Sequence, residues 1–96
     1  MDVRIQAIHF DATEKLEAFI NKKAERLCRK YPAITFVDVT LKVVKPETSK
    51  NKNALVLVTV PPREDMVADK TCDTFEEAVD QAIDALERQL ERLKDK

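Results

Sequence analysis

Residues 34–60 read ITFVDVTLKVVKPETSKNKNALVLVTV, and this stretch decides the fold. Within residues 34–44, valine and leucine alternate with aspartate, threonine and lysine, which is typical of a strand that buries one face. Residues 54–60 (ALVLVTV) form a second apolar strand, and the polar segment KPETSKNKN at 45–53 predicts a loop between the two. The sheet therefore has an apolar face that another layer must cover.

The segment before these strands has the spacing of a helix with one apolar side. We expect this helix over residues 13–30, with Asp11 or Thr13 as its N-cap and Pro32 as its stop. Its apolar residues recur at helical intervals: Leu16, Phe19, Ile20, Ala24, Leu27 and Tyr31.

A second helix is expected after the strands. Thr74 begins it, and Glu77 three residues later completes the pattern of a capping box. Its apolar stripe consists of Phe75, Val79, Ala82, Ile83, Leu86, Leu90 and Leu93.

Two shorter strands complete the expected order. Residues 3–8 alternate between apolar and polar types, and residues 66–70 are short enough for an edge strand after the break at Pro61-Pro62. The predicted order is β-α-β-β-β-α, with no repeat and no linker. We expect a single α+β domain over residues 1–96, a two-layer sandwich in which both helices cover one face of a four-stranded sheet.

Composition excludes several classes of function. The chain of 96 residues has no glycine, so it has neither a P-loop nor a dinucleotide-binding fingerprint. Cys28 and Cys72 form no metal-binding pair, and we interpret them as reduced residues rather than a redox switch. His9 lacks a partnered nucleophile, which favours a structural role over contact with RNA or general-base chemistry. We expect no catalytic residue, metal, cofactor or small-molecule substrate.

The sequence also predicts where the protein works. No apolar run approaches the roughly 18 residues of a membrane span. The N-terminal residues lack the basic and then apolar layout of a signal peptide. We therefore expect a cytoplasmic protein that does not bind membranes.

Positive charge is concentrated on both helices. Lys22, Arg26 and Lys30 stand four residues apart on one, and Arg88, Arg92 and Lys96 repeat this spacing on the other. Each like-charged pair at this spacing costs about 0.2–0.5 kcal/mol, so a sequence selected only for stability would alternate the signs. A solvated helix surface, relieved by pairs such as Asp84–Arg88 and Glu25–Arg29, is the structural alternative to a binding site.

Negative charge is predicted on the other side of the second helix, on Glu76, Asp80, Asp84, Glu87 and Glu91. We interpret these carboxylates as a solvated flank rather than a divalent-ion site. If the helices lie side by side, the two basic ladders are expected to converge on one surface, with the acidic surface beyond it. Lys45, Lys50 and Lys52 would widen that surface.

A polyanion is the natural partner for such a surface. The aromatic residues Phe19, Phe36 and Phe75 are interpreted as core, which argues against base stacking on single strands. The pattern favours recognition of RNA through its shape and phosphate backbone.

The sequence resembles the family of ribosome hibernation promoting factors and ribosome-associated inhibitors. The resemblance rests on the first strand with Ile5 and His9, Thr13 before a helix that ends in basic turns, the strand at 34–44, and Ala78-Val79-Asp80 followed by LERQL at 86–90. The chain departs from the family pattern at Ala85, where many relatives have lysine. It also departs at Asp73-Thr74-Phe75, where the usual motif is D-M-Y.

This resemblance implies a fold related to double-stranded-RNA-binding domains and no catalysis. It implies binding to rRNA of the small ribosomal subunit in the decoding channel, in competition with mRNA and tRNA, so that idle ribosomes are silenced in stress or stationary phase. By position, the family's RNA contacts fall on Lys23, Arg26, Arg29, Lys30, Arg88 and Arg92. Together with the ladders, the expected RNA-binding residues are Lys22, Lys23, Arg26, Arg29, Lys30, Arg88, Arg92 and Lys96.

The chain is similar to short family members, and no C-terminal dimerisation domain is expected. A short form either assists ribosome dimers or silences single ribosomes. Two other interpretations remain: a module that binds other structured RNA, and an adaptor whose basic flank meets an acidic protein.

Overall fold

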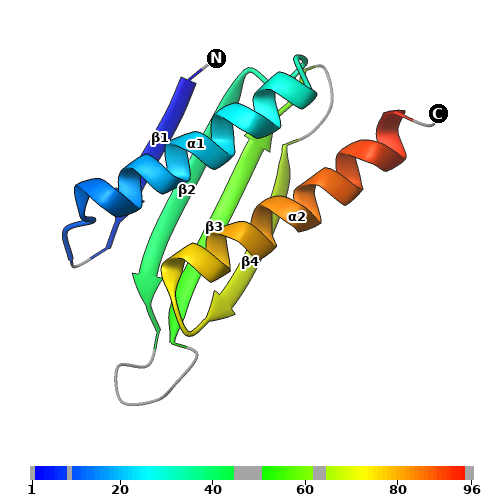
Figure 1. Ribbon diagram of the computed structural model, residues 1–96. Coiled ribbons are helices and arrows are strands. Elements are labelled where there is room, and N and C mark those ends of the chain that lie inside the picture. Colours follow the sequence, from blue (N-terminus) through cyan, green and yellow to red (C-terminus); the bar gives the residue numbers. More distant parts are fainter. Residues whose placement is uncertain (1, 9, 45–50, 62–64, 95–96) are drawn as a thin grey trace.

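The computed structural model describes residues 2–8, 10–44, 51–61 and 65–94. The elements follow the predicted order (Figure 1): β1 (Asp2–Ala7), α1 (Glu14–Lys30), β2 (Phe36–Val43), β3 (Lys52–Thr59), β4 (Met66–Cys72) and α2 (Phe75–Lys94). His9, Lys45, Lys50, Pro62, Lys96 and the side chain of Leu93, which figured in the sequence predictions, lie outside the described part.

The four strands form one mixed sheet in the order β1-β2-β3-β4. β1 pairs with β2 in parallel, with Ile5 opposite Val39, because α1 carries the chain back between them. The other two pairings are antiparallel, with Val39 opposite Val56 and Leu57 opposite Val67. Both helices cover the same face, α1 over the β1–β2 side and α2 over the β3–β4 side (Figure 1). The α+β two-layer prediction is confirmed.

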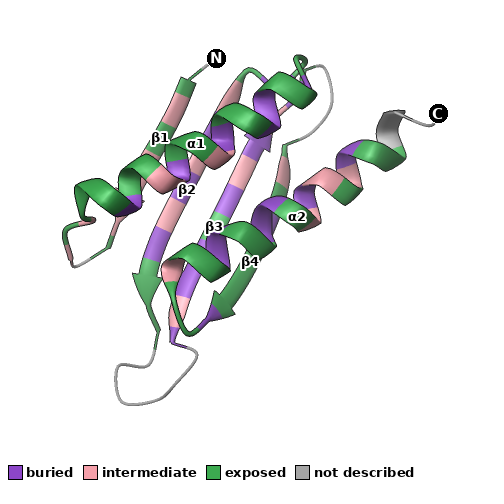
Figure 2. Ribbon diagram, in the orientation of Figure 1, coloured by how far each residue is buried: buried purple, intermediate pink, exposed green. Residues whose placement is uncertain are grey.

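The core lies between the helices and that face. Alternate residues of the central strands are fully buried, including Val37, Val39 and Val56, and they meet Ile20 of α1 and Leu86 of α2. The inner side of each helix is buried and its outer side exposed (Figure 2). Both helices thus pack on the same apolar face of the sheet, and this packing fixes which side of each helix faces inward.

Both helix starts follow the predicted capping residues. Thr13 is extended, and its Oγ1 accepts a hydrogen bond from the Leu16 backbone N–H at 3.1 Å. The Oγ1 of Thr74 accepts from the Glu77 N–H at 3.1 Å. In the described structure, the Glu77 carboxylate accepts from Gln81 at 3.4 Å, so only one half of the predicted capping box forms.

Two predictions need correction. β3 begins at Lys52, inside the segment predicted as loop, because Asn53 is buried and its amide donates to Lys70 O at 3.3 Å and Thr71 Oγ1 at 3.1 Å. Phe36 was predicted in the core. It lies one position before the inward-facing Val37, on the outer face of the sheet, and is half-buried.

No helix in the described part of the chain is long and apolar enough to cross a membrane.

The packing predicts the effect of truncating the core. Leu86→Ala removes a fully buried side chain between α2 and the sheet, so we expect a loss of about 2–5 kcal/mol in the free energy of unfolding, measured by urea denaturation. Leu55→Ala, at a position 37% exposed on the outer sheet face, is the matched control and should cost less than about 1 kcal/mol. Equal losses would contradict this assignment of the core.

Candidate nucleic-acid interface

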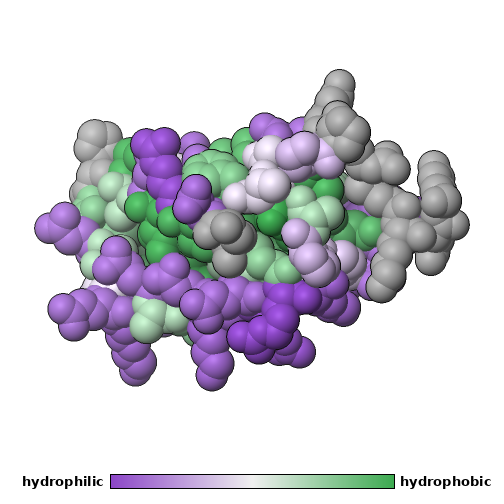
Figure 3. Space-filling view, turned by 90° about the horizontal axis from the view of Figure 1, so that it is seen from above, coloured by the Kyte–Doolittle hydropathy of each residue, from purple (hydrophilic) through white to green (hydrophobic). Residues whose placement is uncertain are grey.

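The apolar stripe of α1 determines where its cations lie. Ile20, Ala24 and Leu27 face the sheet, and each residue turns the helix by about 100°. This rotation directs Lys23 and Lys30 toward α2, and leaves Lys22 and Arg29 on the outer face. Viewed from above, the side of the molecule that carries the helices is hydrophilic (Figure 3).

Two ion pairs join α1 to α2. The Lys23 Nζ lies 2.8 Å from an oxygen of Asp80, and the Lys30 Nζ lies 3.3 Å from Glu87 Oε2. The same two cations lie near aromatic rings of α1, 5.6 Å from the centre of Phe19 and 5.7 Å from that of Tyr31. Lys23 and Lys30 are therefore partly engaged within the protein.

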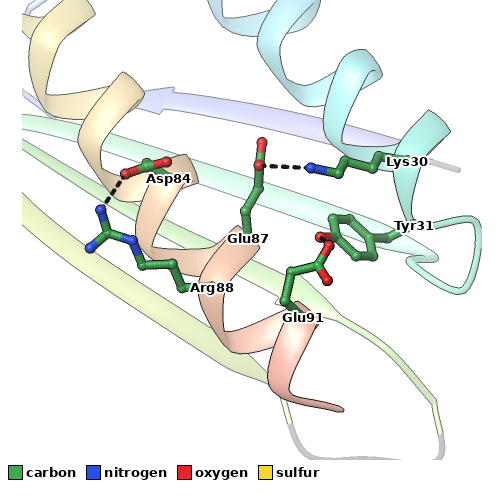
Figure 4. Close-up of polar contacts among 6 residues, drawn as sticks. All are labelled: Lys30, Tyr31, Asp84, Glu87, Arg88 and Glu91. Atoms are coloured by element: carbon green, nitrogen blue, oxygen red, sulfur yellow. Dashed lines mark hydrogen bonds and ion pairs between the residues drawn. The ribbon is translucent and has the colours of Figure 1, made fainter. Parts of the chain in front are cut away.

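These pairs reveal the order of charges across the helix layer. Glu87 and Glu91 extend toward α1, and the guanidinium of Arg88 points away from it (Figure 4). The acidic flank of α2 thus lies between the cations of the two helices. The predicted convergence of both ladders on one surface, with the acidic residues beyond it, is wrong, because the apolar stripe of α2 turns its acidic flank inward.

Three cations on the solvent-facing side of α1 have no ion-pair partner. Within the described residues, Lys22, Arg26 and Arg29 are exposed and make no ion pair, so the predicted Glu25–Arg29 pair is absent. Lys22, Lys23 and Arg26 also line a shallow hollow beside Phe19. This group can accept phosphates without first breaking a salt bridge.

On α2, the predicted Asp84–Arg88 pair forms. An Nη of Arg88 lies 2.9 Å from Asp84, with both side chains largely exposed. Exposed pairs of this kind contribute little to stability and are weakened by salt. Arg92 is exposed and makes no ion pair among the described residues, and Lys96 lies outside them.

A groove runs between the helices. Its lining combines cations with carboxylates: Lys23, Arg26, Asp80, Gln81, Ile83, Asp84 and Glu87. Within the described residues, no cluster of three or more histidine, cysteine or acidic side chains could hold a metal ion. The groove is therefore a surface of mixed charge.

One contact between the helices could not be expected from the apolar pattern alone. Tyr31, the C-cap residue of α1, is 7% exposed, and its hydroxyl donates a hydrogen bond to Glu91 (Figure 4). Burial raises the pKa of Tyr31 to about 12, and the hydrogen bond and the charges of Glu91 and Glu87 add to the effect. Tyr31 had been assigned only to the apolar stripe. The hydroxyl of a buried tyrosine needs a hydrogen-bond partner, so the sequence already indicated that Tyr31 would contact a polar group.

The cysteines do not point to redox chemistry. Cys28 and Cys72 are both buried and form no disulfide. Burial raises the pKa of the Cys28 thiol, which lowers its thiolate fraction.

Comparisons with known proteins place this geometry in context. A family model described as sigma 54 modulation protein / S30EA ribosomal protein matches residues 3–96. The structure is similar to a ribosomal subunit interface protein from Coxiella burnetii, with a TM-score of 0.84, 22% identity and 100% of both chains covered. It is also similar to the N-terminal domain of protein Y from Thermus thermophilus, with a TM-score of 0.79, 21% identity, and 97% and 99% of the two chains covered. No curated protein sequence matches the chain.

The Tyr31–Glu91 contact predicts a pH dependence of stability. Since the pKa of Tyr31 is higher in the folded than in the unfolded state, its contribution is complete below about pH 10 and is lost as pH rises toward 12. The chain has one tyrosine, so tyrosinate absorbance reports Tyr31 alone and should titrate near pH 12.

Tyr31→Phe is the control for this measurement. It should lower the free energy of unfolding by about 1 kcal/mol at pH 7 and remove this part of the alkaline loss. A tyrosinate midpoint near 10 in the folded wild type would contradict the buried hydrogen bond.

Proposed function

Because this chain belongs to the sigma 54 modulation protein / S30EA ribosomal protein family, we propose that it silences idle ribosomes by binding small-subunit rRNA in the decoding channel. In this proposal, the protein occupies the space that mRNA and the anticodon arms of tRNA would fill. Its effect is steric.

Membership of this family establishes that the protein associates with ribosomes. The family consists of ribosome-associated modulation factors that are not enzymes, and ribosome association implies the cytoplasm. The structural relative from Coxiella burnetii is named a ribosomal subunit interface protein. That name supports the proposal that this protein also acts between the subunits.

The proposed binding site rests on three unpaired cations of α1, of which two lie on its outer face and Arg26 lies at the edge of the interhelix groove. Lys22, Arg26 and Arg29 are exposed and form no ion pair among the described residues. Phosphate contacts by lysine and arginine release counterions from RNA, which supplies much of the affinity. Cations without an internal partner can bind phosphate without first giving up an ion pair.

The remaining predicted contacts are of two kinds. Arg92 is exposed on α2 and is available to contact a second segment of the RNA phosphate backbone. Lys96, which lies outside the described residues, is proposed to contact the same segment. Lys23, Lys30 and Arg88 are already in ion pairs, of which the Arg88 pair is exposed and the other two are partly buried, so binding exchanges a carboxylate for a phosphate. We therefore assign the main RNA contact to Lys22, Arg26 and Arg29, with Arg88 and Arg92 as the second contact.

Co-sedimentation tests the proposed site of action. Purified protein should pellet with vacant ribosomes and with isolated small subunits on a sucrose gradient. Saturating mRNA with initiator tRNA should release it, because two polymers cannot fill the same channel. Binding that survives these ligands would indicate another site, and no binding at low salt would favour another structured RNA or an acidic protein as partner.

Charge reversal tests the assigned residues. Arg26→Glu combined with Arg88→Glu should abolish co-sedimentation with ribosomes at moderate salt, because each change replaces a phosphate contact by repulsion. Both positions are exposed, so the thermal unfolding midpoint should change little.

The matched control compares single reversals on the two faces of the molecule. Arg26→Glu should weaken ribosome binding strongly, and Lys42→Glu, exposed on the sheet, should leave it nearly unchanged. Normal binding by the double variant would show that the helix surface is not the RNA contact.

A further inference from the structure

The carboxylates on the inner flank of α2 occupy an unexpected place for an RNA-binding surface. We define the acidic strip as Asp80, Asp84, Glu87 and Glu91. Its residues lie on the flank of α2 that faces α1, so the strip separates the cations of α1 from Arg88 on the other side of α2. Figure 4 shows Glu87 and Glu91 extending toward α1 and the guanidinium of Arg88 pointing away from it. A phosphate backbone that touches both groups of cations must therefore pass over negative charge.

Contacts that hold the two helices together account for only some of the carboxylates in the strip, and we call these contacts bracing. Asp80 and Glu87 pair with α1, and Glu91 accepts from Tyr31. Asp84 instead pairs with Arg88 of its own helix and lines the interhelix groove opposite Arg26. Its carboxylate places negative charge at the groove without joining the helices.

The strip is also accessible to a ligand. The side chains of Asp80 and Asp84 are 59% and 60% exposed, although both are in ion pairs. A phosphate in the groove would approach Arg26 on one wall and Asp84 and Glu87 on the other. Repulsion across a few ångströms is screened only partly at physiological salt.

From this arrangement we infer that the acidic strip is a specificity determinant of the RNA-binding surface. It penalises RNA whose phosphates run continuously across the groove, and it tolerates a folded RNA site whose phosphates lie on both sides and leave the strip uncovered. The inference rests on the proposed function and adds the means by which the protein rejects other RNA.

Neutral substitutions in the strip provide the test. The variant Asp84→Asn with Glu87→Gln keeps side-chain shape and one acceptor oxygen at each position. We expect it to bind random-sequence duplex RNA about fivefold more tightly than the wild type, because two repelling charges are removed. Affinity for vacant ribosomes should rise less, because that site leaves the strip uncovered and gains only from the ion pairs of Lys30 and Arg88 that no longer have to be exchanged. The preference for ribosomes therefore falls.

Two controls separate this effect from net charge and from bracing. Asp2→Asn with Asp65→Asn makes the same change in net charge at exposed positions in the sheet layer, and it should change neither affinity by more than twofold. Lys30→Gln breaks the same interhelix ion pair and leaves every carboxylate of the strip in place, so it is the control for bracing. It should not raise the affinity for duplex RNA, whereas a purely bracing role predicts the same gain as in the neutral variant.

The outcomes distinguish the two proposals. Wild-type protein that fails to bind ribosomes overturns the proposed function, and the inference falls with it. If the wild type binds ribosomes but the neutral variant keeps its preference over duplex RNA, the inference alone is wrong. An equal gain on both ligands also overturns it, because the strip then acts only as diffuse charge.

Discussion

The rest of the structure depends on the burial of a single sheet face. Val37, Val39 and Val56 project from the central strands toward one side, and they stay dry only if a second layer covers them. One helix is too narrow to cover four strands, so α1 and α2 lie next to each other on the same face. Their rotation is set by Ile20 and Leu86, which must point into the core.

This constraint decides how the charges meet. Since the helices cannot rotate without exposing their stripes, the inner flanks face each other, and Lys23 and Lys30 pair with Asp80 and Glu87. The basic ladder of α1 (Lys22, Arg26 and Lys30) therefore does not act as one group. Lys30 turns toward a partner, while the cations on the outer face remain available. Interhelix pairing reduces the repulsion that a uniform ladder would impose.

Much of the fold could be predicted because its signals are local. A hydroxyl at Thr13 or Thr74 caps the helix that it precedes, and alternation over a few residues predicts a strand. The predictions that proved wrong concern residues whose environment is set by parts of the chain distant in sequence. Asn53 belongs to a strand because β4 supplies acceptors for its amide, and Phe36 faces outward because Val37 must face inward.

By itself, the sequence determined the order of elements, the apolar stripe of each helix and the presence of basic ladders on both helices. These properties depend on residue type and on spacing within one element, where periodicity leaves little choice. Only the tertiary structure decided which cations remain unpaired and that the acidic flank lies between the two helices. Those properties depend on which flank of α2 faces α1, a relation set by the topology and packing of the sheet rather than by the pattern along either helix.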